Sequence, residues 1–250
     1  MIRAVLFDSG RVLNYPASGN WFMGPRFFEF VDKKFYERLT DRKGRRAFQK
    51  ALQYVESVPV IQTKEEEYEH FLVFYRILSQ ELPALGITEQ QIGELAGDMV
   101  YNPEKYNFYN DVKQTIMTLH PKYKLGIVSD AWPSLKDVYT HAGLEQYFDT
   151  IVISSQAGSC KPQPEMYQTA LDALGIQAQE AVYVDDNIRN CKGAARLHIK
   201  AYWLCRIGDP TWRRKLYARL HGCELISDLP ELCEKLSVLE KQQEGKSNDK

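Results

Sequence analysis

The chain lacks the features that mark membrane, secreted and nucleic-acid-binding proteins. No apolar run approaches the roughly 18 residues that a membrane-spanning helix needs. The first residues form a strand-like run without the basic and apolar regions of a signal peptide, so we expect no leader sequence. The formal net charge is −1, which favours neither nucleic acid nor an anionic membrane as a partner. We therefore expect a cytoplasmic protein, monomeric or homodimeric, with a small-molecule partner.

Metal-binding cysteine patterns and nucleotide-binding motifs are also missing. The five cysteines are odd in number and dispersed, and no pair has the C-x-x-C spacing of a zinc or redox site. Reduced thiols in a cytoplasmic protein are the simplest interpretation. Neither G-x-x-x-x-G-K-[ST] nor G-x-G-x-x-G occurs, so nucleoside triphosphate and dinucleotide binding lack support.

The chain does contain an ordinary globular composition and a clear change of periodicity along its length. Its 250 residues, 44% of them hydrophobic, can bury a substantial core. A strand-like run opens the chain, and residues 15–106 then show helical spacing with no strand between. Further strand-like runs alternate with helical segments, at 124–128, 150–153, 181–184 and 200–204. The pattern predicts an α/β protein: a Rossmann-like parallel sheet flanked by helices, with an inserted all-helical domain.

This periodicity predicts two domains and a tail. Within the helical insert, Thr63 and Thr88 each stand three residues before Glu or Gln, the spacing of a capping box at a helix start. The end of the chain is polar and charged and lacks large apolar side chains, which is typical of disorder. The predicted parts are an α/β core formed by residues 1–14 and 107–238, a helical cap formed by residues 15–106, and a disordered tail formed by residues 239–250.

Polar residues follow the strand-like runs of the core: Asp8, Ser129 with Asp130, and Asp185 with Asp186 where a run ends, and Lys161 beyond the end of the run at 150–153. Because the carboxyl ends of parallel strands lie at one edge of a sheet, we expect these side chains to converge. Three neighbouring carboxylates repel each other unless a cation lies between them, and oxygen ligands suit Mg²⁺. Lysine and a serine hydroxyl complement phosphoryl oxygens. The sequence therefore predicts a metal-assisted phosphoryl-transfer site with Asp8 as a candidate covalent nucleophile.

Taken in order, these motifs resemble those of the haloacid dehalogenase superfamily, in particular its phosphatases with a helical cap after the first motif. Asp8 falls on the nucleophile of the first motif, and Ser129 on the hydroxyl residue of the second. Gly158-x-x-Lys161-Pro162-x-Pro164-x-x-Tyr167 matches the third motif. The fourth is matched by Val184-Asp185-Asp186-Asn187 followed by Asn190-x-x-Gly193-Ala194. The resemblance covers nearly the whole chain.

The resemblance implies a role for each of these residues. Asp8 would be the nucleophile that forms an aspartyl-phosphate, with Lys161 and Ser129 as its catalytic partners. The residues implied to contact the phosphate are Ser129, Asp130 and Lys161. The implied Mg²⁺ ligands are Asp8, the backbone carbonyl of Gly10, Asp185 and Asp186. The implied substrate is a small phosphorylated metabolite.

Gly10 departs from the family pattern, because phosphatases of this family usually carry a second aspartate at that place. In the family, that acid protonates the leaving oxygen and then activates water, and glycine does neither. Acid–base groups of this kind contribute about 10²–10⁴-fold to the rate. The backbone carbonyl at this place is retained, so metal binding is less affected.

Three interpretations of Gly10 stay open. The first, which we favour, is a phosphatase for substrates with acidic leaving groups, such as anomeric sugar phosphates or acyl phosphates. Within this interpretation, Asp130 or a cap residue is a candidate to replace the missing acid. The second is a catalytically weak or inactive protein of the same fold that binds or regulates. The third is a 2-haloacid dehalogenase, whose halide leaves without a proton. The Asp185–Asp186 pair argues against the third, because those enzymes work without metal.

Four residues close behind the nucleophile are candidates for substrate selection: Arg11, Asn14, Tyr15 and Trp21. In the family the inserted cap closes over the core and selects the substrate. None of these residues identifies the substrate.

Overall fold

The computed structural model describes residues 1–250 apart from 39–41, 59, 207, 209–210 and 249–250. The chain divides into two compact units. The core unit comprises Met1–Asn14, Phe108–Asp130 and Gly143–Lys250, and the insert unit comprises Tyr15–Asn107 and Ala131–Ala142.

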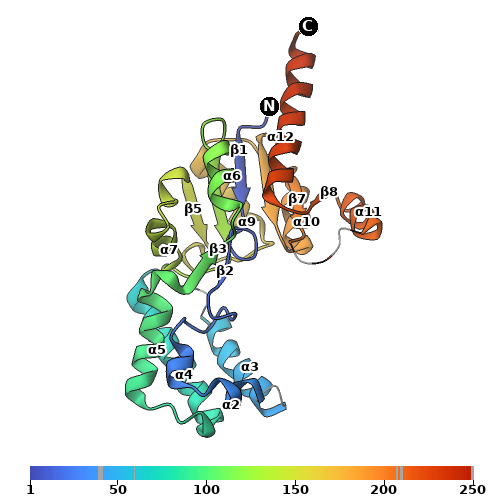
Figure 1. Ribbon diagram of the computed structural model, residues 1–250. Coiled ribbons are helices and arrows are strands. Elements are labelled where there is room, and N and C mark those ends of the chain that lie inside the picture. Colours follow the sequence, from blue (N-terminus) through green and yellow to red (C-terminus); the bar gives the residue numbers. More distant parts are fainter. Residues whose placement is uncertain (39–41, 59, 207, 209–210, 249–250) are drawn as a thin grey trace. The chain divides into compact units, whose positions relative to one another are not determined.

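A six-stranded sheet forms the centre of the core unit (Figure 1), with the order β5-β4-β1-β6-β7-β8 and parallel pairing throughout. The strands are β1 (Ala4–Phe7), β4 (Lys124–Ser129), β5 (Thr150–Ile153), β6 (Ala181–Asp185), β7 (Lys200–Leu204) and β8 (Cys223–Ile226). The central strands β1 and β6 are buried along their whole length, as expected for a sheet covered on both faces. The predicted α/β class is confirmed. The sequence analysis did not anticipate β8.

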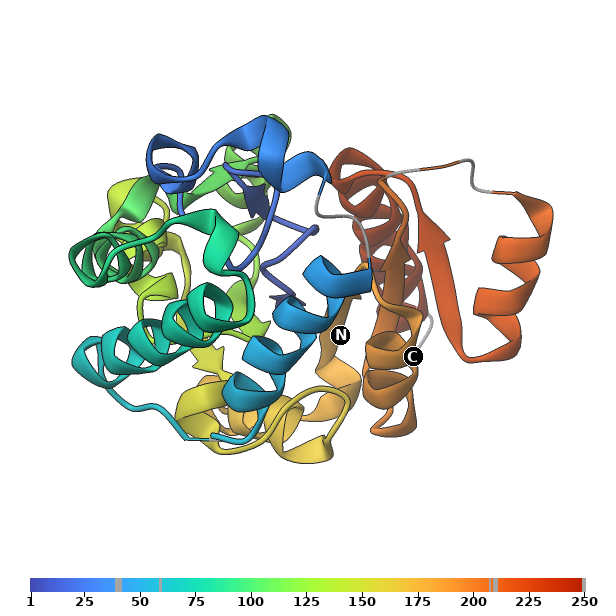
Figure 2. The same ribbon diagram turned by 90° about the horizontal axis from the view of Figure 1, so that it is seen from below.

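Helices cover both faces of this sheet, with α6 and α12 on one face and α9 and α10 on the other (Figures 1 and 2). The helices of the core unit are α6 (Val112–Leu119), α8 (Ser154–Ala157), α9 (Pro164–Leu174), α10 (Ile188–Arg196), α11 (Trp212–Leu220) and α12 (Leu229–Asn248), with single 3₁₀ turns η3 (Glu145–Tyr147) and η4 (Ala178–Glu180). The buried apolar cluster between the sheet and α9 and α10 includes Leu6, Val128, Met166, Tyr167 and Tyr183.

Helix α12 continues through Asn248 and so includes residues 239–248 of the predicted tail. Its first turns are anchored by Leu229, Leu232 and Leu236, which are buried. Beyond residue 239, Glu240 accepts a hydrogen bond of 2.6 Å from the Tyr123 hydroxyl, which extends the anchored part of the helix. Residues 249–250 of the predicted tail lie outside the described residues. Among the described helices, none combines the length and the apolar content that crossing a bilayer takes.

The insert unit is built from helices around an aromatic core. Its elements are α1 (Phe27–Phe30), α2 (Lys33–Arg38), α3 (Arg42–Glu56), α4 (Lys64–Glu81), α5 (Glu89–Tyr101) and α7 (Leu135–His141), with the 3₁₀ turns η1 (Pro83–Leu85) and η2 (Pro103–Lys105). Thr88 and Gln91 form the expected capping box of α5. Thr63 caps α4 through the Glu66 amide at 3.2 Å, whereas the Glu66 side chain accepts from Gln62 and not from Thr63. The apolar core includes Phe27, Phe71, Phe74, Tyr75 and Leu95.

Residues 131–142, which the sequence analysis placed in the core domain, group with the insert unit. A buried polar cluster explains this grouping: the Ser134 amide donates to Glu67 at 2.8 Å, and the Lys105 ammonium hydrogen-bonds both the Ser134 hydroxyl and the Met99 carbonyl. The Trp132 ring also packs against Phe71, with centroids 5.2 Å apart. Long-range polar pairing of this kind has no local sequence signal.

The chain passes between the two units along two short strands, β2 (Asn14–Pro16) and β3 (Tyr106–Phe108), which form a separate two-stranded sheet. Two of the four unit boundaries fall within these strands, after Asn14 and before Phe108, and the other two lie after Asp130 and after Ala142.

Candidate active site

The register of the central strands sets Asp8 level with Asp185 and places Ser129 one residue further along β4. Phe7 pairs with Ile127 of β4 on one side and with Val184 of β6 on the other, so the next residue, Asp8, leaves the sheet beside the ends of both neighbours. The Asp8 amide continues the ladder by donating to the Val184 carbonyl at 2.9 Å. The parallel sheet therefore brings together residues that are more than 100 positions apart in the chain.

Lys161 connects two of the carboxylates at this edge. Its ammonium lies 2.6 Å from Asp8 Oδ1 and 3.1 Å from Asp185 Oδ2, and the side chain is 2% exposed. Its backbone amide donates to the Asp130 carboxylate at 2.9 Å, which holds the loop that carries it. Although burial alone would lower it, the neighbouring Asp8, Asp185 and Asp130 hold the pKa of Lys161 above its ordinary value, so the side chain is a cation.

Asp185 is fully buried and is oriented by donors on both carboxylate oxygens. Oδ1 accepts from the Asn187 amide at 2.7 Å, and Oδ2 accepts from the Asn190 side chain at 3.0 Å as well as from Lys161. The Tyr183 hydroxyl also donates to Oδ2. Burial, followed by the charge of Asp185, raises the pKa of Tyr183 well above its ordinary value, so this hydroxyl remains a donor.

Tyr183 was not among the predicted site residues, and Asn190 was predicted only as part of the fourth motif, without a role of its own. Alternate residues of a strand face the same side of a sheet. The position of Tyr183, two residues before Asp185, is therefore the local signal that could have identified it. Gly193 helps to position Asn190, which lies on the same helix. A Cβ at Gly193 would lie 2.6 Å from Pro162 Cβ, so α10 can approach the Lys161 loop closely only because this residue is glycine.

Asp186 is the more accessible member of the acid pair, with its side chain 26% exposed. Burial, then the charge of Asp185, raises the pKa of Asp186 to about 6, and the Arg11 guanidinium at 3.8 Å opposes this shift. The Asp186 carbonyl accepts from the Trp203 indole at 2.8 Å, which fixes the backbone of the pair.

The three carboxylates fit a divalent cation. One oxygen from each of Asp8, Asp185 and Asp186 lies within 4.8 Å of the other two. Burial raises the pKa of Asp8 to about 7; Lys161 opposes that shift, and the charge of Asp185 adds to it. Oxygen ligands with one accessible side are what Mg²⁺ takes in proteins. A cation at this position would lower the cost of keeping all three groups ionised.

A tight turn follows Asp8 and contains Gly10. The Asn14 side chain is buried, and its amide donates to the Ser9 hydroxyl at 2.7 Å, while the Arg11 amide donates to the Asn14 carbonyl at 2.6 Å. Arg206 supports the turn from outside, with two hydrogen bonds to the Val12 carbonyl at 3.1 and 2.8 Å. The sequence analysis had also missed Arg206, which follows β7, a strand separated from β1 by β6.

The predicted substrate-selecting residues take different places. Arg11 is 65% exposed and adopts a left-handed backbone with φ of 59°, next to the acid pair. Asn14 is enclosed in the turn described above. Tyr15 and Trp21 belong to the insert unit, where the Trp21 ring packs on Tyr106 with centroids 5.2 Å apart. Ser129, which ends β4, is 3% exposed.

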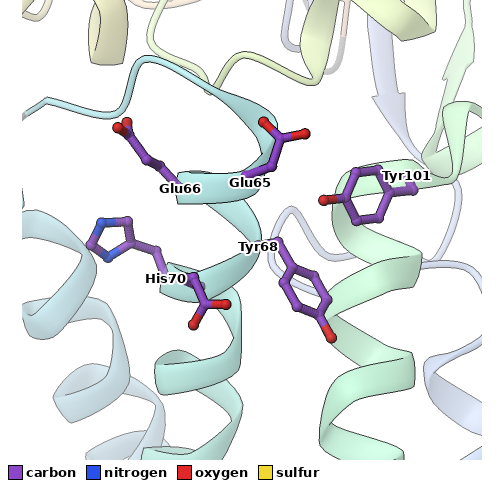
Figure 3. Close-up of a pocket in the computed structure, with 6 residues that line it drawn as sticks. Glu65, Glu66, Tyr68, His70 and Tyr101 are labelled. Atoms are coloured by element: carbon purple, nitrogen blue, oxygen red, sulfur yellow. The ribbon is translucent and has the colours of Figure 1, made fainter.

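A separate shallow pocket lies on the insert unit between α4 and α5 (Figure 3). It is lined by Glu65, Glu66, Tyr68, Glu69, His70 and Tyr101. Figure 3 shows Glu65 and Tyr101 on one side of α4 and His70 on the other. Because these groups do not converge on one point, we do not assign a site there.

Residues 46–204 match the family described as haloacid dehalogenase-like hydrolase. The chain belongs to this family. The matching segment contains Ser129, Lys161 and the acid pair, and it begins after Asp8.

Several relatives with curated names are phosphatases. A phosphoserine phosphatase from Thermus thermophilus is 26% identical over 134 residues, which are 52% of this chain and 54% of that protein. A glyceraldehyde 3-phosphate phosphatase from Pyrococcus furiosus is 27% identical over 155 residues, which are 59% of this chain and 62% of that protein. The chain therefore spans less than two thirds of the length of these relatives.

Solved structures show the same fold. An L-2-haloacid dehalogenase from Xanthobacter autotrophicus, with chloropropionic acid covalently bound, superposes with a TM-score of 0.60 at 20% identity, over 95% of this chain and 99% of that one. Likeness at this identity shows the fold alone. The chemistry has to be argued from the residues of the site.

Proposed function

We propose that the protein is a Mg²⁺-dependent phosphatase of small phosphorylated metabolites, with Asp8 as the nucleophile. The observation that carries the proposal is the cluster of Asp8, Asp185 and Asp186, with oxygens within 4.8 Å of one another and Lys161 between two of them. The names of the sequence relatives support a phosphomonoester as substrate. The five cysteines, none of which forms a disulfide, support a reducing compartment such as the cytoplasm.

Each residue of the cluster has a task in this reaction. Asp8, Asp185 and Asp186 would hold the metal, which when bound neutralises charge on the phosphoryl oxygens. Lys161 would neutralise charge on the Asp8 carboxylate and on the incoming phosphate. The Ser129 hydroxyl would donate a hydrogen bond to a phosphoryl oxygen. Asp185, held by Tyr183 and Asn190, would keep its orientation through the reaction.

The bond changes are those of a double displacement. One Asp8 oxygen forms a bond to phosphorus as the ester bond to the leaving oxygen breaks, and the leaving oxygen takes a proton from solvent. Water then attacks the aspartyl-phosphate, which returns Asp8 and releases inorganic phosphate. The overall change is a phosphomonoester and water giving an alcohol and phosphate.

Gly10 narrows the substrate class. With no carboxylic acid at this place, the leaving group receives no positioned proton, so groups that are stable as anions depart fastest. Anomeric sugar phosphates and acyl phosphates have such leaving groups. The backbone of Gly10 is not in the left-handed region, so an aspartate can be introduced there without backbone strain.

The test is hydrolysis of phosphate esters, ranked by the pKa of the leaving group, in the presence of Mg²⁺. We expect the natural chain to favour low-pKa leaving groups, Asp8→Asn to be inactive, and Gly10→Asp to gain about 10²-fold on alkyl phosphates. A chain that hydrolyses no ester, and gains nothing from Gly10→Asp, would overturn the proposal. Tight binding of a phosphate mimic without turnover would then indicate a regulatory protein. Halide release from 2-haloacids in the presence of a chelator would indicate a dehalogenase.

A further inference from the structure

Helix α11 (Trp212–Leu220) carries an unusual set of side chains for the outside of a globular domain. Its sequence is Trp-Arg-Arg-Lys-Leu-Tyr-Ala-Arg-Leu, with four basic residues and no acidic one. Only Ala218 is buried, and Arg214 is directed inward, with its guanidinium 2.9 Å from Cys205 Sγ. The remaining face of the helix is available to solvent.

A ridge of large apolar side chains runs along that exposed face. Trp212, Leu216 and Leu220 are 69%, 48% and 73% exposed. Because they are spaced four residues apart, they lie one above the other on the same side of the helix. We call these three residues the α11 ridge. Single exposed apolar residues are normal on protein surfaces, but an aligned set of this size marks an interaction site.

Basic side chains flank the ridge on both sides. From the helical repeat, Arg213 lies along one side and Lys215 and Arg219 along the other. All three are exposed, and within the described part of the chain none of them has an ion-pair partner. Trp212, Leu216, Lys215 and Arg219 also line a groove between α11, β8 and α12 that contains two acidic residues. Of these, Glu224 is paired with Lys200 and Lys235, and Glu231 accepts a hydrogen bond from the Ser227 amide at 2.8 Å.

We propose that α11 docks on an anionic lipid surface, with the α11 ridge in the headgroup region and the basic flanks on the lipid anions. An apolar stripe bordered by Lys and Arg, with Trp and Leu in the stripe, is the pattern of helices that lie in a membrane interface. From the net charge of −1 we expected no binding to an anionic membrane. A net charge describes the whole chain and does not show the local positive charge of one helix.

The position and charge of α11 favour lipid over other occupants. The helix lies at the outer edge of the core unit, beyond the edge strand β8 (Figures 1 and 2), and the three ridge side chains are 48–73% exposed. A second copy of the chain would bring two basic helices face to face, which is unfavourable without counter-charge. A polyanion without an apolar layer would leave the ridge in water. The proposal does not depend on the phosphatase reaction.

The experiment is flotation of the full chain with vesicles of phosphatidylcholine, alone or with about 30% phosphatidylserine. We expect about tenfold more bound protein with phosphatidylserine, and loss of that excess in about 1 M salt. Trp212 is the one exposed tryptophan of four, all of which are described, so its fluorescence should shift to the blue on binding. Trp212→Phe should keep most of the binding and lose most of the shift.

Two double variants separate the contributions. Leu216→Ser with Leu220→Ser should abolish binding, and Arg213→Gln with Arg219→Gln should remove the preference for phosphatidylserine. Met117→Ser, at a residue of α6 that is 45% exposed, is the matched control and should bind as the natural chain does. Absence of vesicle binding, or binding that both double variants retain, overturns the proposal. So does ridge-dependent self-association, or ridge-dependent binding to an acidic polypeptide, when vesicles are not bound.

Discussion

The ammonium of Lys161 lies 2.6 Å from Asp8 Oδ1 and 3.1 Å from Asp185 Oδ2, and so bridges the candidate nucleophile and a candidate metal ligand. All three side chains are nearly or fully buried. A buried cation between two carboxylates is expected to serve both folding and catalysis, because without it two negative charges lose their compensation. The two effects can be measured separately.

Lys161→Met is expected to lower the free energy of unfolding by about 3 kcal/mol in the presence of a chelator. Mg²⁺ should restore part of this loss, because a cation between Asp8 and Asp185 replaces the missing charge. Phosphatase activity should fall by at least about 10²-fold even with Mg²⁺. Urea unfolding with and without Mg²⁺, together with kcat, checks these results.

Lys50→Met is the control, since Lys50 forms an exposed pair with Glu81, and its removal should change little. Equal stability of Lys161→Met and the natural chain in chelator would contradict the expectation.

Tyr183→Phe is expected to weaken Mg²⁺ binding by about 10-fold, because groups that orient a metal ligand contribute on this scale. The variant removes only the hydroxyl that donates to Asp185, and the ring keeps its edge contact with Tyr167, at a centroid distance of 5.2 Å. Calorimetric titration with Mg²⁺ gives the affinity without relying on turnover.

The control for this measurement is Tyr202→Phe. Tyr202 is equally buried, but it pairs with Val184, so its side chain lies on the face of the sheet opposite to Tyr183 and Asp185. Equal losses of affinity in both variants would show a general effect of the substitutions on the fold.

In the insert unit, Glu67→Leu is expected to destabilise the protein by about 3 kcal/mol, because Lys105 then stays buried without its carboxylate. The double variant Glu67→Leu with Lys105→Met should be less destabilised than either single variant, since no buried charge is left unpaired. Urea unfolding of the four proteins in a double-mutant cycle measures the coupling. Additive losses would show that Glu67 and Lys105 do not interact. Lys64→Met, at the half-exposed pair with Asp137, serves as the surface comparison.

The amino-acid sequence by itself determined the class of fold and the convergence of the strand-end residues. Alternating strand-like and helical runs indicate a parallel sheet, and a parallel sheet places the ends of β1, β4 and β6 at one edge. The structure accordingly brings Asp8, Lys161, Asp185 and Asp186 together. Their catalytic roles stay predictions.

Only the tertiary structure decided which other residues support that site. Tyr183 and Arg206 act through hydrogen bonds to Asp185 and to the Val12 carbonyl, and neither residue belongs to a motif. Grouping of residues 131–142 with the insert unit depends on Ser134 meeting Glu67 across 67 positions of the chain. The exposed ridge of α11 was likewise invisible, because periodicity shows that a face is apolar but not whether anything covers it. Local patterns report what a segment can form, whereas pairing between distant segments depends on packing that no single stretch contains.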